Sequence, residues 1–146
     1  MITIKNRVRR IMLSTRWVRE RIKKMLDVVG YADFDIGVMF TTDRTIRVYN
    51  KKYRKKDVPT DILSFPYYAD LKPGHKLPVF SHDEKDLGDI VISLESAKRD
   101  ATAQNRSLKE HVEILLSPRN SLRDRKTLRK MSWVASSASS RFPSMR

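Results

Sequence analysis

The order in which strand-like and helix-like apolar patterns follow one another limits the fold that this sequence can adopt. Strand-like segments alternate apolar and polar residues, whereas helix-like segments place apolar residues every three or four positions. The order is strand, helix, strand, helix, strand, strand, helix and helix. It predicts a single α+β domain with three layers, built on a four-stranded mixed sheet with packed helices. The expected strands are Ile2–Lys5, Phe34–Thr41, Ile62–Phe65 and Asp89–Ser93.

Capping residues indicate where the helices begin and end. A side-chain oxygen just before a helix can accept a hydrogen bond from one of its first N–H groups. Gly30 is placed to end the first helix, and Glu110 completes a capping-box spacing at the last one. The polar segment Tyr67–Asp86 is long for a connection, which is typical of an insertion or a functional loop. The expected N-terminal caps are Ser14, Asp43, Ser93 and Ser107.

Charge is the strongest feature of the composition. The chain has 31 Lys and Arg residues against 17 Asp and Glu, and a formal net charge of +14. This excess favours a polyanionic partner such as nucleic acid, because cations that bind phosphates release condensed counterions. The alternatives are a basic surface without a partner and import into an organelle. The sequence has no cysteine, which excludes disulfides, cysteine nucleophiles and thiolate metal sites.

Residues 1–19 are basic and contain no acidic side chain before Glu20. They resemble a mitochondrial transit segment, and they equally suit a basic first strand and helix of the domain. They lack the uninterrupted apolar core of a signal peptide, and no stretch of the chain approaches the ~20 apolar residues of a membrane span. The expected location is mitochondrial, with the cytoplasm or nucleus as alternatives.

The three histidines, His75, His82 and His111, do not have the spacing of a helical zinc site. Two imidazoles lie on one helix face when they are four residues apart, and no two of these are. His75 and His82 fall among acidic residues in the long loop, where solvated charge is the simpler interpretation. His111, near the start of the last helix, suits a packed or surface histidine. The sequence also lacks a P-loop and a Gly-x-Ser-x-Gly elbow.

A basic run precedes a proline turn and the third expected strand, and it includes Arg54, Lys55 and Lys56. Cations at the end of a helix interact favourably with its dipole, which gives the run a structural role. Alternatively, Arg54 projects toward a cleft and binds a phosphate with two parallel hydrogen bonds. The residues themselves leave both interpretations open.

The segment from Tyr53 to Pro66 reads Tyr-Arg-x-x-Asp-x-Pro-Thr-Asp-x-Leu-Ser-Phe-Pro, and residues 87–93 read Leu-Gly-Asp-Ile-Val-Ile-Ser. The two motifs together resemble the YbeY family of endoribonucleases over about residues 1–116. The resemblance implies a zinc-dependent enzyme that cleaves single-stranded RNA in ribosomal RNA maturation and ribosome quality control, with RNA and the ribosomal small subunit as partners. Eukaryotic members occur in mitochondria and chloroplasts. It also implies a functional, catalytic role for Arg54. We expect Arg54, Lys55 and Lys56 to contact the RNA.

The sequence departs from that family directly after Leu116. The family holds its zinc with His-Gly-x-x-His-Leu-x-Gly-x-x-His, but residues 117–119 here are Ser-Pro-Arg and no histidine follows. We therefore expect residues 1–116 to form a domain that lacks the metal-binding helix. We also expect that this chain has no metal ligands and does not bind zinc. Leu115 and Leu116 are expected to lack packing partners. Residues 117–146 form the predicted disordered tail, rich in Ser and Arg, with eight basic residues against Asp124. A different exon, a frame change or an error in the gene model would each produce such a tail.

Three hypotheses for function follow. The first is a catalytically inactive version of the family's metal-dependent endoribonuclease. The second is a non-catalytic RNA- or ribosome-binding protein that uses Arg54 and the basic tail. The third, a zinc protease, ranks last because the sequence has no His-Glu-x-x-His.

Overall fold

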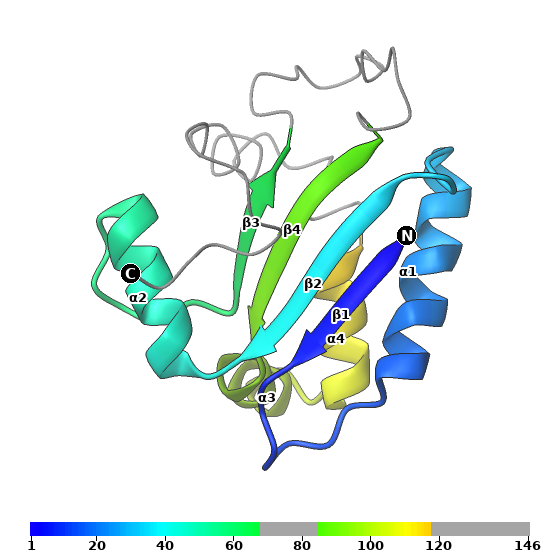
Figure 1. The fold of residues 1–146 in the computed structure, drawn as a ribbon. Coiled ribbons are helices and arrows are strands. Elements are labelled where there is room, and N and C mark those ends of the chain that lie inside the picture. Colours follow the sequence, from blue (N-terminus) through cyan, green and yellow to red (C-terminus); the bar gives the residue numbers. More distant parts are fainter. Residues whose placement is uncertain (68–84, 118–146) are drawn as a thin grey trace.

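The computed structural model describes residues 1–67 and 85–117, and these form a four-stranded mixed sheet (Figure 1). The strand order is β1-β2-β4-β3, with β1 parallel to β2, β2 parallel to β4, and β3 antiparallel to β4. This arrangement confirms the expected sheet. The strands are β1 (Ile2–Asn6), β2 (Asp35–Thr41), β3 (Ile62–Pro66) and β4 (Asp86–Ser93).

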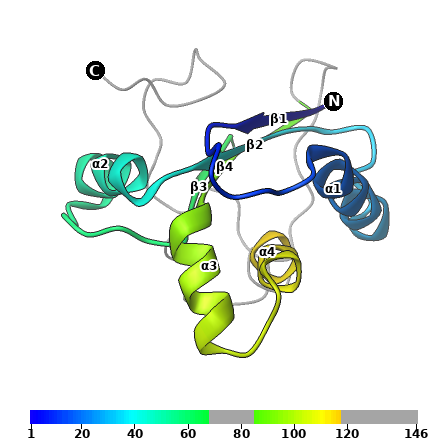
Figure 2. The same cartoon turned by 90° about the horizontal axis from the view of Figure 1, so that it is seen from below.

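Helices cover the sheet in two groups. Figure 2 shows α1, α3 and α4 gathered together below the sheet, with α2 apart from them near β3. Neighbouring residues of a strand point to opposite faces, so each group meets its own set of side chains. The result is the three-layer α+β domain that the order of elements predicts. The helices are α1 (Thr15–Val29), α2 (Asp43–Arg54), α3 (Leu94–Ala103) and α4 (Leu108–Leu116).

The two faces of the sheet form separate cores. Phe40 and Ile92 are register partners on β2 and β4, and both belong to the larger cluster with α1, α3 and α4. Met39 and Val91, one residue earlier on each strand, pack in a smaller cluster with residues of α2. This alternation places α2 on the opposite face of the sheet from the other three helices.

The end of α4 is packed rather than exposed. Leu115 and Leu116 are 7% and 5% exposed and belong to the larger core cluster. The expectation that they lack packing partners is wrong, because that cluster also contains residues of α1 and of the sheet, such as Leu26 and Val38.

Local capping explains most helix boundaries. The Ser14 hydroxyl accepts a hydrogen bond from the Trp17 N–H, and Gly30 ends α1 in the left-handed conformation. Ser93 caps α3, and Ser107 forms the predicted capping box with Glu110 at α4. The prediction for α2 is wrong by one residue, since Thr42 is its cap.

Gly88 explains one of the two sequence motifs in structural terms. Gly88 lies inside β4, which begins at Asp86 rather than at the expected Asp89. Its φ is +97°, in the region that L side chains rarely adopt. A Cβ atom on Gly88 would lie 2.1 Å from the Phe65 carbonyl oxygen of β3. The close approach of the two strands therefore requires glycine at this position.

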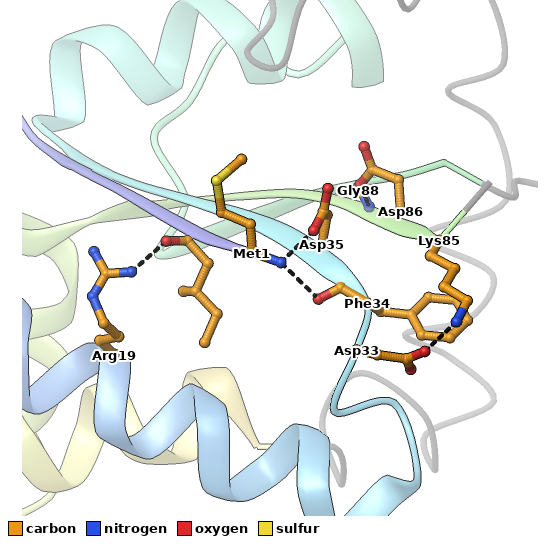
Figure 3. A network of polar contacts seen from close by, with 9 residues as sticks. Met1, Arg19, Asp33, Phe34, Asp35, Lys85, Asp86 and Gly88 are labelled. Carbon is orange, nitrogen blue, oxygen red and sulfur yellow. Dashed lines mark hydrogen bonds and ion pairs between the residues drawn. The ribbon is translucent and has the colours of Figure 1, made fainter. Parts of the chain in front are cut away.

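The basic start of the chain is part of the domain. Figure 3 shows the Met1 amino group beside the Phe34 carbonyl and the Asp35 carboxylate, and the Arg19 guanidinium donating to the Ile2 carbonyl oxygen. Residues of β1 pair with β2, and the α1 side chains Val18, Ile22 and Leu26 are buried. Of the two interpretations of residues 1–19, the structure shows a first strand and helix, while mitochondrial location stays a prediction.

Several expectations concern segments that the structure does not describe. The greater part of the long loop, with His75 and His82, and nearly all of the predicted tail lie outside the described residues. Within the described ranges, no helix has the length and apolar character needed to cross a membrane.

Candidate functional site

The basic turn, by which we mean residues Arg54, Lys55 and Lys56, begins at the last residue of α2. Lys55 is the C-cap and has φ 57° and ψ 27°, a left-handed conformation that non-glycine residues seldom adopt. Its backbone N–H donates to the Lys51 carbonyl oxygen at 3.1 Å, and that of Lys56 donates to Asn50 at 3.3 Å. These bonds reverse the chain and leave the Lys55 and Lys56 side chains exposed.

Three side chains of α2 hold the segment after the basic turn against the helix. Asn50 is 1% exposed, and its amide donates to the Val58 carbonyl oxygen at 2.7 Å. Asp57 accepts hydrogen bonds from Arg47 at 2.9 Å and from Lys51 at 3.1 Å. These bonds hold the pKa of the Asp57 carboxyl below its usual value. The chain directly after the basic turn is therefore attached to α2 at two places, at Asp57 and at Val58.

Arg54 differs from Arg47 and Lys51 because no acidic side chain of the described residues pairs with it. Arg47 and Lys51 pair with Asp57, whereas Arg54 forms no hydrogen bond or ion pair in the described part of the chain. Its side chain is half-buried. Lys56 likewise has no polar partner among the described residues, and the Lys55 ammonium donates only to the Lys52 carbonyl oxygen. The structure thus brings together the three residues singled out for RNA binding; their roles remain predictions.

Aromatic side chains lie beside the basic turn. The Tyr53 and Phe65 rings meet edge to face with centroids 5.2 Å apart, and Tyr49 lies 6.4 Å from each of them. Tyr49 is 2% exposed, and burial raises the pKa of its phenol. These aromatic contacts hold the end of α2 against β3, and so they fix the position of the backbone at Arg54.

A second group of polar residues lies where β3, α3 and α4 meet. Asp61 precedes β3, Asp100 is on α3 and His111 is on α4, and one potential ligand atom from each lies within 4.8 Å of the others. His111 is only 4% exposed, and neither of its ring nitrogens has a hydrogen-bond partner in residues 1–67 and 85–117. Carboxylates and an imidazole are together able to hold a divalent cation. We call these three residues the Asp–Asp–His cluster.

Sequence reasoning missed this cluster. His111 was expected to be a packed or surface histidine, and its burial agrees with the first of these. Asp61 belongs to the motif from Tyr53 to Pro66 but was assigned no ligand role, and Asp100 belongs to neither motif. Each comes from a different part of the sequence than His111. The spacing rules for metal ligands detect pairs on one helix, whereas these ligands meet only through the packing of α3, α4 and β3.

The zinc centre that the family resemblance implies does not fit the residues present. That centre needs three histidines, and the sequence has none after His111. Across residues 1–67 and 85–117, the single group of three potential ligands is the Asp–Asp–His cluster, with one histidine. No chemical step through a three-histidine zinc can therefore be assigned to this chain.

A three-layer α+β fold with a basic turn between α2 and β3 is the architecture that the two sequence motifs imply, and comparison with known proteins identifies its family. The sequence model of the family described as "Endoribonuclease YbeY" matches residues 3–117. The chain therefore belongs to the YbeY endoribonuclease family, as the motifs from Tyr53 to Pro66 and over residues 87–93 predicted.

Individual relatives agree with this assignment. An endoribonuclease YbeY of Aquifex aeolicus is 40% identical over 117 residues, covering 77% of this chain and 71% of the relative. The human endoribonuclease YbeY is 33% identical over 94 residues, covering 64% of this chain and 56% of the relative. A solution structure of a Thermotoga maritima protein matches 90% of this chain with a TM-score of 0.50 and 18% identity, which supports the fold alone.

Proposed function

We propose that this chain binds single-stranded RNA through the basic turn at the end of α2 and does not cleave it by the family's three-histidine zinc mechanism. Relatives that carry the name endoribonuclease supply the substrate class, since the name implies RNA. The observation that carries the proposal is the state of Arg54: half-buried, and without an acidic partner in the described part of the chain.

Arg54 has the properties of a phosphate ligand rather than of a structural cation. A cation that serves only a helix end is satisfied by carbonyl oxygens or by water, and Lys55 illustrates this with its bond to Lys52. Asp57, the nearest acid in sequence, is already bonded to Arg47 and Lys51. The guanidinium is thus available for two parallel hydrogen bonds to a phosphate, and Lys55 and Lys56 add positive charge beside it.

The proposed setting is ribosomal RNA maturation, with the ribosomal small subunit as the larger partner and the mitochondrion as the location. Family membership supports the first of these. The tail over residues 117–146 is proposed to add phosphate contacts, because it contains eight Lys and Arg residues against one acid.

The test uses a labelled single-stranded ribosomal RNA and three forms of the full chain: wild type, Arg54→Gln and Arg44→Gln. Arg44 is the matched control because it is on the same helix, exposed and equally charged. We expect Arg54→Gln to weaken RNA binding by about tenfold, as loss of a bidentate contact worth ~1.4 kcal/mol implies. Arg44→Gln should change it much less.

Cleavage is measured in the same samples, with added zinc and with a chelator. No cleavage in either condition is expected.

In the binding experiment, equal effects of the two arginine substitutions would show that RNA does not contact the basic turn. Chelator-sensitive cleavage by the wild type would show that the proposed inactivity is wrong.

A further inference from the structure

We propose that Asp61, Asp100 and His111 form a binding site for a first-row divalent transition-metal ion, separate from the family's three-histidine centre. One ligand atom from each residue lies within 4.8 Å of the other two. The proposal does not depend on RNA binding by the basic turn, because it concerns other residues and is tested by a different measurement.

His111 supplies the independent observation that points to a ligand. The residue is only 4% exposed, yet neither its Nδ1 nor its Nε2 has a hydrogen-bond partner among the described residues. Buried polar side-chain atoms are almost always bonded, so two unbonded nitrogens on one buried ring call for an explanation. A metal ion that takes one of the two nitrogens as a ligand, with the carboxylates of Asp61 and Asp100 on the same ion, explains that nitrogen and leaves the other as a donor.

The two carboxylates also lack cationic partners. In the described part of the chain, neither Asp61 nor Asp100 forms an ion pair, although the protein as a whole is strongly basic. Two carboxylates that both approach one buried histidine repel each other unless a positive charge lies between them. A divalent cation neutralises both and converts this repulsion into attraction.

The supporting structure holds the ligands in place before an ion arrives. Asp61 Oδ1 accepts hydrogen bonds from the Ile62 N–H at 2.8 Å and the Thr60 hydroxyl at 3.3 Å. The Asp61 carbonyl oxygen accepts from the Ser93 N–H at 2.9 Å, which joins the start of β3 to the end of β4. Asp100 and His111 belong to α3 and α4, which contact each other. Three rigid elements thus converge on one point.

The ligand set selects the class of ion. Magnesium and calcium prefer oxygen ligands alone, whereas one imidazole with two carboxylates is typical of zinc, manganese, iron or cobalt. With ligand distances of ~2.1 Å, three ligand atoms around one ion lie ~3.0–3.6 Å apart, so side-chain rotation needs to bring atoms at the 4.8 Å limit closer by about 1 Å or more. Three protein ligands leave a further position for water or an anionic oxygen.

Metal binding is measured by calorimetry on the metal-free full chain with zinc and with manganese, and by the visible spectrum of added cobalt. We expect one ion per chain, and a cobalt spectrum with nitrogen and oxygen ligands. Asp100→Asn and His111→Gln should each weaken binding more than tenfold. Glu113→Gln is the matched control, since it removes a carboxylate of α4 that is not in the cluster, and it should leave affinity unchanged.

A second measurement on the unsubstituted chain covers the case in which a variant fails to fold. Substoichiometric manganese should broaden the NMR signals of residues 61, 100 and 111 before those of residues at the basic turn. Binding that is too weak to detect with millimolar metal, or that is unaffected in a folded His111→Gln chain, would overturn the proposal. Broadening centred elsewhere would overturn it equally.

Discussion

At the residue scale, Lys55 combines a backbone cost with a proposed role in RNA binding. A non-glycine residue in the left-handed region costs roughly 1–2 kcal/mol, and glycine is the usual residue at the end of a helix. Lys55 nevertheless occupies this place with φ 57°. The chain therefore keeps a cation where glycine would be more stable, a compromise that is common at functional sites.

Replacing Lys55 with glycine separates these two effects. We expect Lys55→Gly to raise the free energy of unfolding by about 0.5–1 kcal/mol, because the relief of strain exceeds the added flexibility of the unfolded chain. The same substitution should weaken RNA binding. Urea unfolding and RNA titration measure the two quantities. Lys55→Ala is the control, since it removes the charge but keeps the strain. A Lys55→Gly chain less stable than the alanine variant would contradict this account.

At the element scale, Asp43 joins the first turns of α2 and α3. Its carboxylate accepts hydrogen bonds from the Ser93 and Ser96 hydroxyls at 2.6 and 2.5 Å, and pairs with Arg99 at 2.6 Å. Its backbone N–H donates to the Glu95 carboxylate at 2.8 Å. Asp43 was expected to cap α2, but Thr42 does so, which leaves the Asp43 side chain to reach across to α3.

This connection predicts a stability change in acid. Burial alone raises the pKa of Asp43, but hydrogen bonds from Ser93, Ser96 and Arg99, with the charge of Arg99, outweigh burial and lower the pKa below 3.8. The stability that Asp43 contributes is therefore complete above about pH 4 and is lost as pH falls through its folded-state pKa. Asp43→Asn should cost roughly 1–3 kcal/mol at pH 7 and flatten the acid dependence of unfolding below pH 4. Glu20→Gln, at an exposed ion pair with Arg16, is the control and should change neither. An unchanged acid profile in Asp43→Asn would contradict the assignment.

What could be predicted from the sequence follows the range of the interactions. Local signals succeeded: apolar periodicity indicated all four strands, and Ser14, Ser93 and Ser107 each cap the helix that they precede. The start of β4 at Asp86 was missed, because its first residues are fixed by pairing with β2 and β3. The Asp–Asp–His cluster was missed for the same reason, since it exists only after α3, α4 and β3 pack together.

At the scale of the whole molecule, the net charge of +14 makes electrostatic attraction to RNA long-ranged and largely independent of sequence. The two proposed sources of this attraction differ in kind. The basic turn is a placed set of three cations attached to a rigid helix, whereas the eight basic residues of 117–146 are proposed to act through charge alone. The salt dependence of binding distinguishes them. Each phosphate contact adds its own share to the slope of the logarithm of the binding constant against the logarithm of the salt concentration.

Binding of single-stranded RNA should weaken with salt along a line whose slope is roughly −0.7 for each phosphate contacted. We expect Arg54→Gln to make this slope less steep by roughly 0.7, and to weaken binding at every salt concentration. A full-length chain in which the eight basic residues of 117–146 become glutamine should lose several such contacts, but should keep the tenfold effect of Arg54→Gln. Fluorescence anisotropy over a range of potassium chloride concentrations measures both slopes. If neutralising the tail also abolished the effect of Arg54→Gln, the basic turn would have no binding role of its own, and the +14 chain would hold RNA only as a diffuse polycation.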